Sequence, residues 1–210
     1  MGYQVGLQVR FPVGVPGICR GLLLVAMFFG ACGACKTQDK RLRECEVALR
    51  DPSVQAMLDV IARSEGAETW ASARWGGIRS YLVRYPYGTF VGFQEHPHEK
   101  ICSYILGKKV CSTAAGRYQI LAATWDWIRK VLKLKDFSPR NQDIVAVFLI
   151  IEKGALEDVK RGRFETAVNK LNRVWPSFPG SPYGQPTKKM ASLKKIFEER
   201  RLFYSNGGRR

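Results

Sequence analysis

The sequence predicts an α+β fold in which one helix, a small β lobe and a helical lobe follow one another, with a cleft between the lobes. Apolar residues recur at helical spacing before residue 66 and after residue 118, whereas the segment between is rich in aromatic residues, glycines and short alternating runs. The chain has 210 residues, 46% of them apolar and 25% charged, which is typical of one globular domain plus an extra segment. We therefore expect one functional site, in the cleft.

Residues 1–35 predict an export signal. They contain two basic residues, Arg10 and Arg20, no acidic residue, and an apolar run from Gly21 to Phe29 that small residues follow. The stretch from Gly21 to Cys35 has 15 residues, fewer than the roughly 20 that a transmembrane helix needs. The expected location is the periplasm or the cell envelope.

Two cysteines at the end of this segment are candidates for lipidation. Small residues precede both Cys32 and Cys35, as in the cleavage box of a bacterial lipoprotein, in which the cysteine becomes the lipidated first residue. Phe29, three places before Cys32, is atypical of such a box. A plain cleaved signal and a signal-anchor that later leaves the membrane are the alternatives.

The first helix is expected after a charged segment, residues 36–50, which we interpret as a tether or N-terminal extension. Asp51 is an acidic N-cap followed by a proline at the first helical position. Gly66 ends the helix. The apolar residues in between follow helical spacing: Val54, Met57, Leu58, Ile61 and Ala62.

The β lobe is predicted from Trp70 to Cys111, with runs such as Tyr-Leu-Val-Arg-Tyr (81–85) as strands. Cys102 and Cys111 flank a segment that reads as two strands around a Gly-Lys turn, so their side chains can face each other across a hairpin. In an oxidising compartment we expect a disulfide there. Two free buried thiols are the alternative.

Helices return after Tyr118. Ser138 is placed to cap a helix that Pro139 begins. Residues 143–151 are almost continuously apolar; periodicity alone allows a central strand, but the helical flanks favour a buried helix. Residues 51–206 form the expected catalytic domain. Two further sets of apolar residues have helical spacing and predict two more helices. The first is Phe164, Ala167, Val168, Leu171, Val174 and Trp175, and the second is Met190, Leu193, Ile196 and Phe197.

The formal charge of +16 predicts attraction to polyanions. Nucleic acid, anionic lipids and anionic cell-wall polymers all meet this requirement, but export removes the protein from cytoplasmic nucleic acid. We expect anionic envelope polymers or lipids as partners, no nucleic acid, and a monomer. His96 and His98 are the only histidines and the cysteines lack zinc-ligand spacing, so we expect no metal and no cofactor.

Glu65 is the candidate catalytic carboxyl. At about 100° per residue it lies within about 20° of the helix face that Val54 begins, at the last turn of the helix. Burial and the negative end of the helix dipole both disfavour the anion, so the pKa of this carboxyl should rise, as a general acid requires. Alternatively, Glu65 bonds backbone donors or an arginine at the helix end.

Several motifs along residues 50 to 200 occur in the order found in one known family. The chain resembles the lambda-type phage endolysins, which have a lysozyme-like fold. The matching pieces are Ser64-Glu65-Gly66, His96-Pro97, the run Ser112 to Gln119, Lys135 to Pro139 with Gln142-Asp143, Gly154-Ala155-Leu156, and the run Trp175 to Gln185.

This resemblance implies cleavage of the bond between N-acetylmuramic acid and N-acetylglucosamine in the glycan strands of peptidoglycan. It implies a lytic transglycosylase, in which Glu65 is the single acid and base and the product is a 1,6-anhydro sugar. A hydrolytic lysozyme is one alternative and would usually need a second carboxylate, for which Glu68 and Glu95 are nearby. A non-catalytic peptidoglycan-binding protein of the same fold is the other.

The resemblance also implies substrate-binding residues. Arg117, Tyr118 and Gln119 match an element of the family's cleft floor, and Tyr183 and Gln185 lie in the other specific element. We include Glu95 as a residue lining the substrate, and we interpret Trp175 as part of the core rather than as a sugar contact. The chain departs from the family in the Trp- and Ala-rich loop 67–79, in Thr113-Ala114-Ala115-Gly116, and in carrying its own signal.

Overall fold

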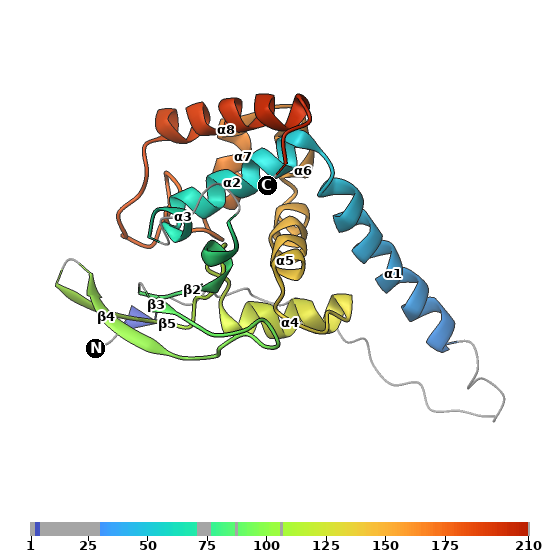
Figure 1. Cartoon of the computed structure of the whole chain (residues 1–210), viewed down its shortest axis with the longest axis horizontal. Helices are drawn as coiled ribbons and strands as arrows, with labels where there is room; N and C mark the ends of the chain where they lie inside the picture. The colour runs from blue at the N-terminus through green and yellow to red at the C-terminus, as the bar shows by residue number, and fades with distance from the viewer. Residues whose placement is uncertain (1–2, 5–29, 71–76, 87, 106, 210) are drawn as a thin grey trace, which may run out of the picture.

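A computed structural model describes residues 3–4, 30–70, 77–86, 88–105 and 107–209. It has the predicted α+β architecture, with a helical lobe above a small β lobe (Figure 1). The helices are α1 (Gly30–Ala48), α2 (Pro52–Ser64), α3 (Ala67–Trp70), the 3-10 helix η1 (Ile78–Leu82), α4 (Ala122–Leu132), α5 (Pro139–Glu152), α6 (Leu156–Lys160), α7 (Phe164–Leu171) and α8 (Met190–Ser205). The strands are β1 (Tyr3–Gln4), β2 (Val83–Arg84), β3 (Gly88–Thr89), β4 (Ile101–Ile105) and β5 (Lys108–Ser112).

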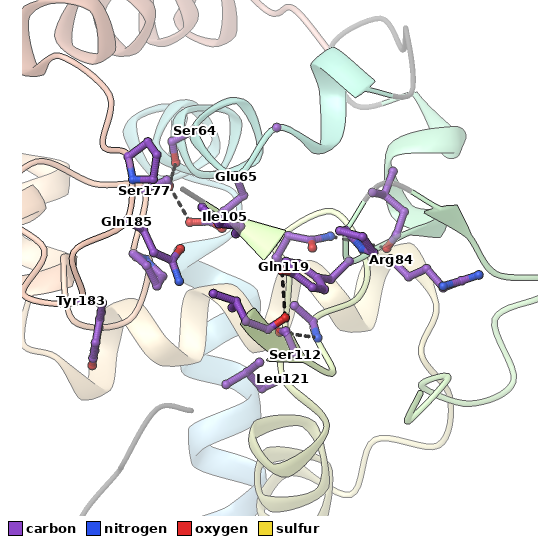
Figure 2. Close-up of a pocket in the computed structure, with 18 of the residues that line it drawn as sticks. Ser64, Glu65, Arg84, Ile105, Ser112, Gln119, Leu121, Ser177, Tyr183 and Gln185 are labelled. Atoms are coloured by element: carbon purple, nitrogen blue, oxygen red, sulfur yellow. Dashed lines mark hydrogen bonds between the residues drawn. The ribbon is translucent and has the colours of Figure 1, made fainter. Parts of the chain in front are cut away.

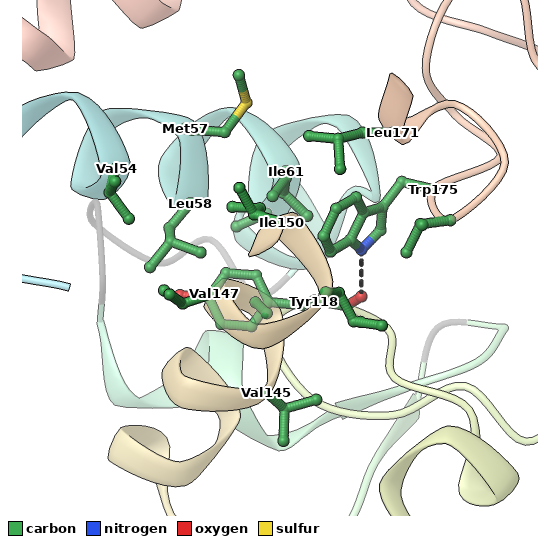
Figure 3. Packing of buried hydrophobic residues seen from close by; sticks show 14 of the residues in the cluster. Val54, Met57, Leu58, Ile61, Tyr118, Val145, Val147, Ile150, Leu171 and Trp175 are labelled. Carbon is green, nitrogen blue, oxygen red and sulfur yellow. Dashed lines mark hydrogen bonds between the residues drawn. The ribbon is translucent and has the colours of Figure 1, made fainter. Parts of the chain in front are cut away.

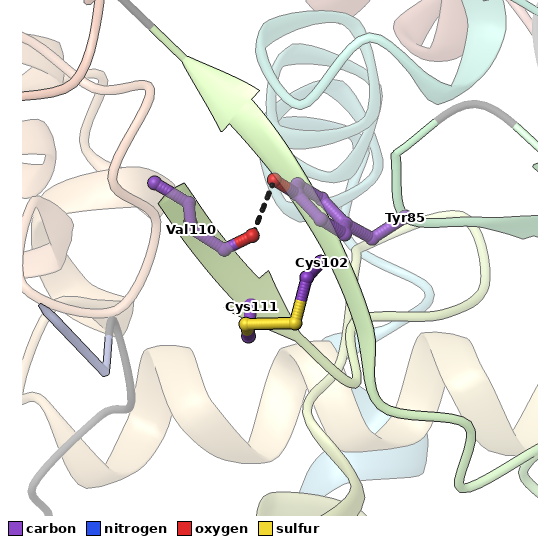
Figure 4. The surroundings of a disulfide bond; sticks show 4 residues. All are labelled: Tyr85, Cys102, Val110 and Cys111. Carbon is purple, nitrogen blue, oxygen red and sulfur yellow. Dashed lines mark hydrogen bonds between the residues drawn. A yellow bond between two sulfur atoms is a disulfide. The ribbon is translucent and has the colours of Figure 1, made fainter. Parts of the chain in front are cut away.

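The β lobe is built around the antiparallel hairpin of β4 and β5, with β1 parallel to the other edge of β5 and with β2 and β3 as a separate pair. Cys102 and Cys111 are direct partners in the hairpin register and are joined by a disulfide (Figure 4). The Tyr85 hydroxyl donates to the carbonyl of Val110 at 3.3 Å and ties the β2–β3 segment to the hairpin. The prediction of a strand over residues 81–85 is wrong in its first half, because η1 continues through Leu82.

Helix α2 begins where the sequence predicts. Oδ1 of Asp51 accepts hydrogen bonds from the backbone N–H groups of Ser53 (2.8 Å) and Val54 (3.3 Å), which satisfies donors that have no partner within the helix. The apolar residues predicted for this helix are fully buried, and α8 lies along it (Figures 1 and 3).

Helix α5 is the buried helix predicted from the apolar run. The Ser138 hydroxyl accepts from the N–H of Asn141 at 3.4 Å, which confirms the predicted cap. Residues Ile144 to Ile150 are buried, and α5 passes through the middle of the molecule with α1, α2, α4 and η1 against it (Figures 1 and 3). A helix that is apolar on every side needs such surroundings.

Of the two alternatives predicted for residues 36–50, the structure fits an N-terminal extension and not a tether. Helix α1 crosses the predicted boundary at residue 35 and packs against α4 and α5, with Cys45 and Ala48 buried in the core (Figure 1). One face carries three apolar residues at helical spacing: Leu42, Cys45 and Leu49. Charged residues outnumber them in this segment, so the apolar face is hard to recognise from the sequence. The packed body therefore begins before residue 51.

The predicted export signal falls largely outside the described residues, because residues 1–2 and 5–29 are not among them. The side chains of Cys32 and Cys35, the lipidation candidates, also lie outside the described part. Within the described residues, no helix combines the length and the apolar character that crossing a membrane requires.

Candidate active site

A cleft of about 320 Å³ opens between the helical lobe and the β lobe (Figure 2). Its walls come from segments that are far apart in the sequence: the end of α2, the β2 segment, the inner side of the hairpin, and the loop between α7 and α8. Its polar and charged lining residues are Ser64, Glu65, Arg84, Tyr85, Ser112, Gln119, Ser177, Tyr183, Gln185 and Lys188.

Glu65 occupies the C-cap of α2 and points into the cleft from its helical wall (Figure 2). It is half-buried, and its Oε1 accepts a hydrogen bond from the hydroxyl of Ser177 at 2.5 Å. The Ser177 hydroxyl also lies 2.9 Å from that of Ser64. Ser177 thus contacts one oxygen of the carboxyl directly, Ser64 contacts only Ser177, and Glu65 lines the cleft.

Burial raises the pKa of Glu65 from 4.5 to about 7. The hydrogen bonds from Ser177 and the positive charge of Lys188 act in the opposite direction and moderate the rise. Near neutral pH the carboxyl is therefore present in both protonation states. This is the condition under which one group can donate a proton and later take one back.

Among the described residues that line the cleft, Glu65 is the only one with a carboxyl group. Glu68, one of the two candidates for a second carboxylate, is buried and forms an ion pair with Arg117. Glu95 lies outside the lining residues: its side chain is 60% exposed and pairs with Arg129 at 3.2 Å. The contact of Glu95 with substrate stays a prediction, and the cleft lining does not support it.

Arg117 and Tyr118 do not lie on the cleft floor, and the expectation that they bind substrate is wrong. Arg117 is fully buried; its Nη2 donates to Oδ1 of Asp59 at 2.7 Å and to Oε1 of Glu68. Tyr118 is also fully buried, and its hydroxyl donates to Oδ1 of Asp143. A guanidinium without contact to water needs carboxylate partners, and these hold it inside the protein.

Gln119 is the residue of this motif that lines the cleft. Its backbone has a positive φ of 48°, which turns it away from its two buried neighbours. Its side-chain Nε2 donates to the carbonyl of Gly116 at 2.9 Å, and this bond fixes the amide beside the cleft.

Tyr183 and Gln185 lie on the opposite wall, in the loop between α7 and α8, as the prediction requires (Figure 2). The Tyr183 hydroxyl donates to the carbonyl of Arg173 at 3.1 Å, which anchors that part of the loop.

Trp175 belongs to the core, as predicted. Its indole N–H donates to the carbonyl of Tyr118 at 3.1 Å and the side chain is 3% exposed (Figure 3).

His96 is likewise structural: it is buried, one ring nitrogen lies 2.9 Å from the carbonyl oxygen of Ile120, and burial lowers its pKa to about 4. Across the described residues, no three His, Cys, Asp or Glu side chains gather in a way that could hold a metal ion.

Sequence analysis did not identify Ser177 or Lys188 as site residues. Ser177 was visible only as a member of the Trp175 to Gln185 run, and its contact with Glu65 spans 112 residues of sequence. Lys188 lies after that run, and nothing in the sequence distinguishes it from the many other lysines of the chain. The one available signal was the position of Ser177 within the motif.

Comparison with known proteins gives a consistent result. A family model described as Endolysin matches residues 55–201. The endolysin of Escherichia phage lambda is 39% identical over 145 residues, which cover 69% of this chain and 89% of that endolysin. The endolysin of Escherichia phage P2 is 36% identical over 150 residues, which cover 69% of this chain and 90% of that endolysin. A solved structure of bacteriophage lambda lysozyme complexed with a chitohexasaccharide has a TM-score of 0.64 at 38% identity, covering 71% of this chain and 94% of that one. A second lambda lysozyme structure has a TM-score of 0.61 at 37% identity, with the same shares covered.

Replacing Glu65 by Gln should stabilise the fold at pH 8 and change it little at pH 4. The folded pKa lies above the unfolded value, so below pH 4.5 the carboxyl is protonated in both states. Between pH 4.5 and 7 the carboxyl of the unfolded wild-type chain is already ionised, so folding must either bury this charge or bind a proton, and the amide needs neither. We expect a gain of about 1–3 kcal/mol at pH 8, measured by urea unfolding across the pH range. An equal effect at both pH values would contradict the raised pKa.

Replacing Arg117 by Ala should destabilise the fold by about 3–5 kcal/mol, because two buried carboxylates lose their shared cation. The matched control is Arg129→Ala, which breaks an exposed pair with Glu95 and should cost less than about 1 kcal/mol. Denaturant unfolding measures both values. If the folded Arg117 variant lost glycan affinity with unchanged stability, the buried structural role would be wrong.

Proposed function

The chain belongs to the endolysin family, and on that premise we propose that it cleaves peptidoglycan as a lytic transglycosylase with Glu65 as the proton-transferring group. Family membership makes it a glycan-cleaving enzyme that degrades peptidoglycan. The observation that carries the finer proposal is the single carboxyl in the cleft, whose pKa burial raises to about 7.

In the proposed reaction, protonated Glu65 donates its proton to the oxygen that links N-acetylmuramic acid to the next sugar. The bond from this oxygen to the anomeric carbon breaks, and the 6-hydroxyl of the same muramoyl unit attacks that carbon. The Glu65 carboxylate accepts the proton that the hydroxyl loses, so the enzyme returns to its starting state. One carboxyl near its pKa can serve both steps, and no water molecule is consumed.

The hydrolytic alternative fits the cleft less well. An inverting or retaining glycosidase usually places a second carboxylate across the sugar, roughly 5 to 10 Å from the first. The two candidates from sequence are both engaged elsewhere, Glu68 with buried Arg117 and Glu95 with Arg129 outside the cleft. A purely binding protein would have no use for a carboxyl that Ser177 holds in the cleft with a raised pKa.

Gln119, Tyr183 and Gln185 are the proposed substrate contacts. They line the cleft on both sides of Glu65, where amides can hydrogen-bond acetamido and hydroxyl groups and an aromatic ring can pack on a sugar face. The existence of a lambda lysozyme complex with a chitohexasaccharide supports a glycan as the ligand.

Action on the cell wall follows from the family, and we propose that residues 1–35 direct the export that this requires. The disulfide between Cys102 and Cys111 suits an oxidising compartment. Lipidation at Cys32 or Cys35, a monomeric state and the absence of nucleic-acid binding remain predictions.

Digestion of purified peptidoglycan tests the proposed chemistry. The wild-type protein should release 1,6-anhydro-muramoyl products, lighter by one water than the products of hydrolysis, and Glu65→Gln should release at least about 100-fold less. Mass spectrometry of the released muropeptides distinguishes the products. Reducing-end products would show a hydrolase instead, and no release by the wild type would leave a binding protein.

Ser177→Ala should shift the pH dependence of the reaction. The Ser177 hydroxyl lowers the pKa of Glu65, so its loss raises this pKa and moves the alkaline fall in kcat/KM to higher pH, by about one unit. The maximal kcat should fall about tenfold, because the carboxyl loses a positioning contact. Ser192→Ala, an exposed serine on α8, is the matched control. An unshifted profile for Ser177→Ala would rule out this role.

A further inference from the structure

The loop between α7 and α8 returns to the catalytic carboxyl at Lys188. The backbone N–H of Lys188 donates to the carbonyl of Ser177 at 2.9 Å, and the hydroxyl of this same serine donates to Glu65. Lys188 is exposed, lines the cleft and lowers the pKa of Glu65 by its charge. The fold therefore fixes a cation at the site where the glycan would be cut.

The Lys188 ammonium differs from other cations of the protein in its surroundings. Arg84, the other cation in the cleft lining, donates to the carbonyl of Thr89 at 3.0 Å and lies 3.5 Å from Glu99. Lys170 and Lys194 each form an ion pair within 3 Å. Within the described residues, Nζ of Lys188 has no hydrogen bond or ion pair, so its charge is available to a molecule in the cleft.

The position of Lys188 matches a chemical difference between glycans. The sugar whose anomeric carbon reacts beside Glu65 carries, in peptidoglycan, a lactyl ether on the same ring. This substituent ends in a carboxylate or in a peptide stem that bears carboxylates, whereas a polymer of N-acetylglucosamine has neither. An ammonium near Glu65 can thus reach an anionic group in peptidoglycan that a neutral glycan lacks.

We propose that Lys188 is a specificity-determining residue that binds the carboxylate substituent of the muramoyl unit and so selects peptidoglycan over neutral N-acetylglucosamine polymers. This inference rests on the proposed function, because it places the muramoyl unit beside Glu65. It assigns Lys188 to substrate selection and leaves proton transfer to Glu65.

The test compares Lys188→Gln with Lys189→Gln in the full chain. Both changes remove one positive charge at adjacent exposed positions, but Lys189 is outside the cleft lining. Three ligands are used: stem-bearing peptidoglycan, the same glycan stripped of its peptides by an amidase, and the neutral N-acetylglucosamine hexasaccharide. Affinity is measured for all three and kcat/KM for the first two, at about pH 5.5, where Glu65 is protonated in every variant.

Lys188→Gln should weaken binding and lower kcat/KM about tenfold on a carboxylate-bearing ligand, mainly through KM, and leave the affinity for the hexasaccharide within about twofold. Raising the salt to about 0.5 M should shrink the difference. Lys189→Gln should stay within about twofold of wild type throughout. A loss confined to the stripped glycan identifies the lactyl carboxylate, and one confined to the stem-bearing form identifies the peptide.

Equal losses for the two variants would overturn the proposal, because general attraction between the basic protein and the anionic wall would explain them. An equal loss of hexasaccharide affinity in Lys188→Gln would also overturn it, since the contact would then be with the sugar itself. The binding measurements stand even if the wild type releases no product, an outcome that would count against the proposed function alone.

Discussion

The buried carboxylate of Asp59 is the constraint around which this protein is arranged. It lies in the middle of α2 with no exposure to solvent and receives Nη2 of Arg117 at 2.7 Å, Nε of Arg200 at 2.7 Å and the hydroxyl of Tyr204 at 2.6 Å. A buried charge is tolerated only when such partners surround it. Because one partner comes from the segment between the hairpin and α4 and two from α8, the requirement ties α2 to both sides of the molecule.

This arrangement determines the position of Glu65, the proposed catalytic carboxyl. Glu65 lies in the sequence between Asp59 and Glu68, and both of these pair with the same arginine, Arg117. Arg117 therefore fixes the chain on both sides of Glu65, and Ser177 adds the direct contact to the Glu65 carboxyl. The buried ion pairs and the Ser177 contact thus fix the cleft wall at the residue that we propose transfers the proton, a step that depends on a fixed geometry.

The chemistry depends on a balance of opposed effects at Glu65. Burial raises the pKa of this carboxyl, while the Ser177 hydroxyl and the Lys188 charge lower it, and the result is a pKa of about 7. The cation that moderates this acid is the one that we propose binds an anionic substituent of the substrate. Both groups that lower the pKa of Glu65 belong to one loop, residues 176–188, in which the backbone N–H of Lys188 donates to the carbonyl of Ser177.

The sequence by itself determined the local structure: the Asp51 cap, the apolar stripes, the buried helix α5, and the hairpin whose cysteines face each other, because neighbouring residues fix these features. It also singled out Glu65, through the Ser64-Glu65-Gly66 motif together with its place on the helix face. Only the tertiary structure decided which residues of a motif face the cleft. Arg117 and Tyr118 turn inward to carboxylates that lie 58 and 25 residues away, Ser177 meets Glu65 across 112 residues, and α1 joins the core through a short apolar face. A buried charge takes its orientation from partners that are distant in the chain, and spacing along the sequence does not encode that distance in space.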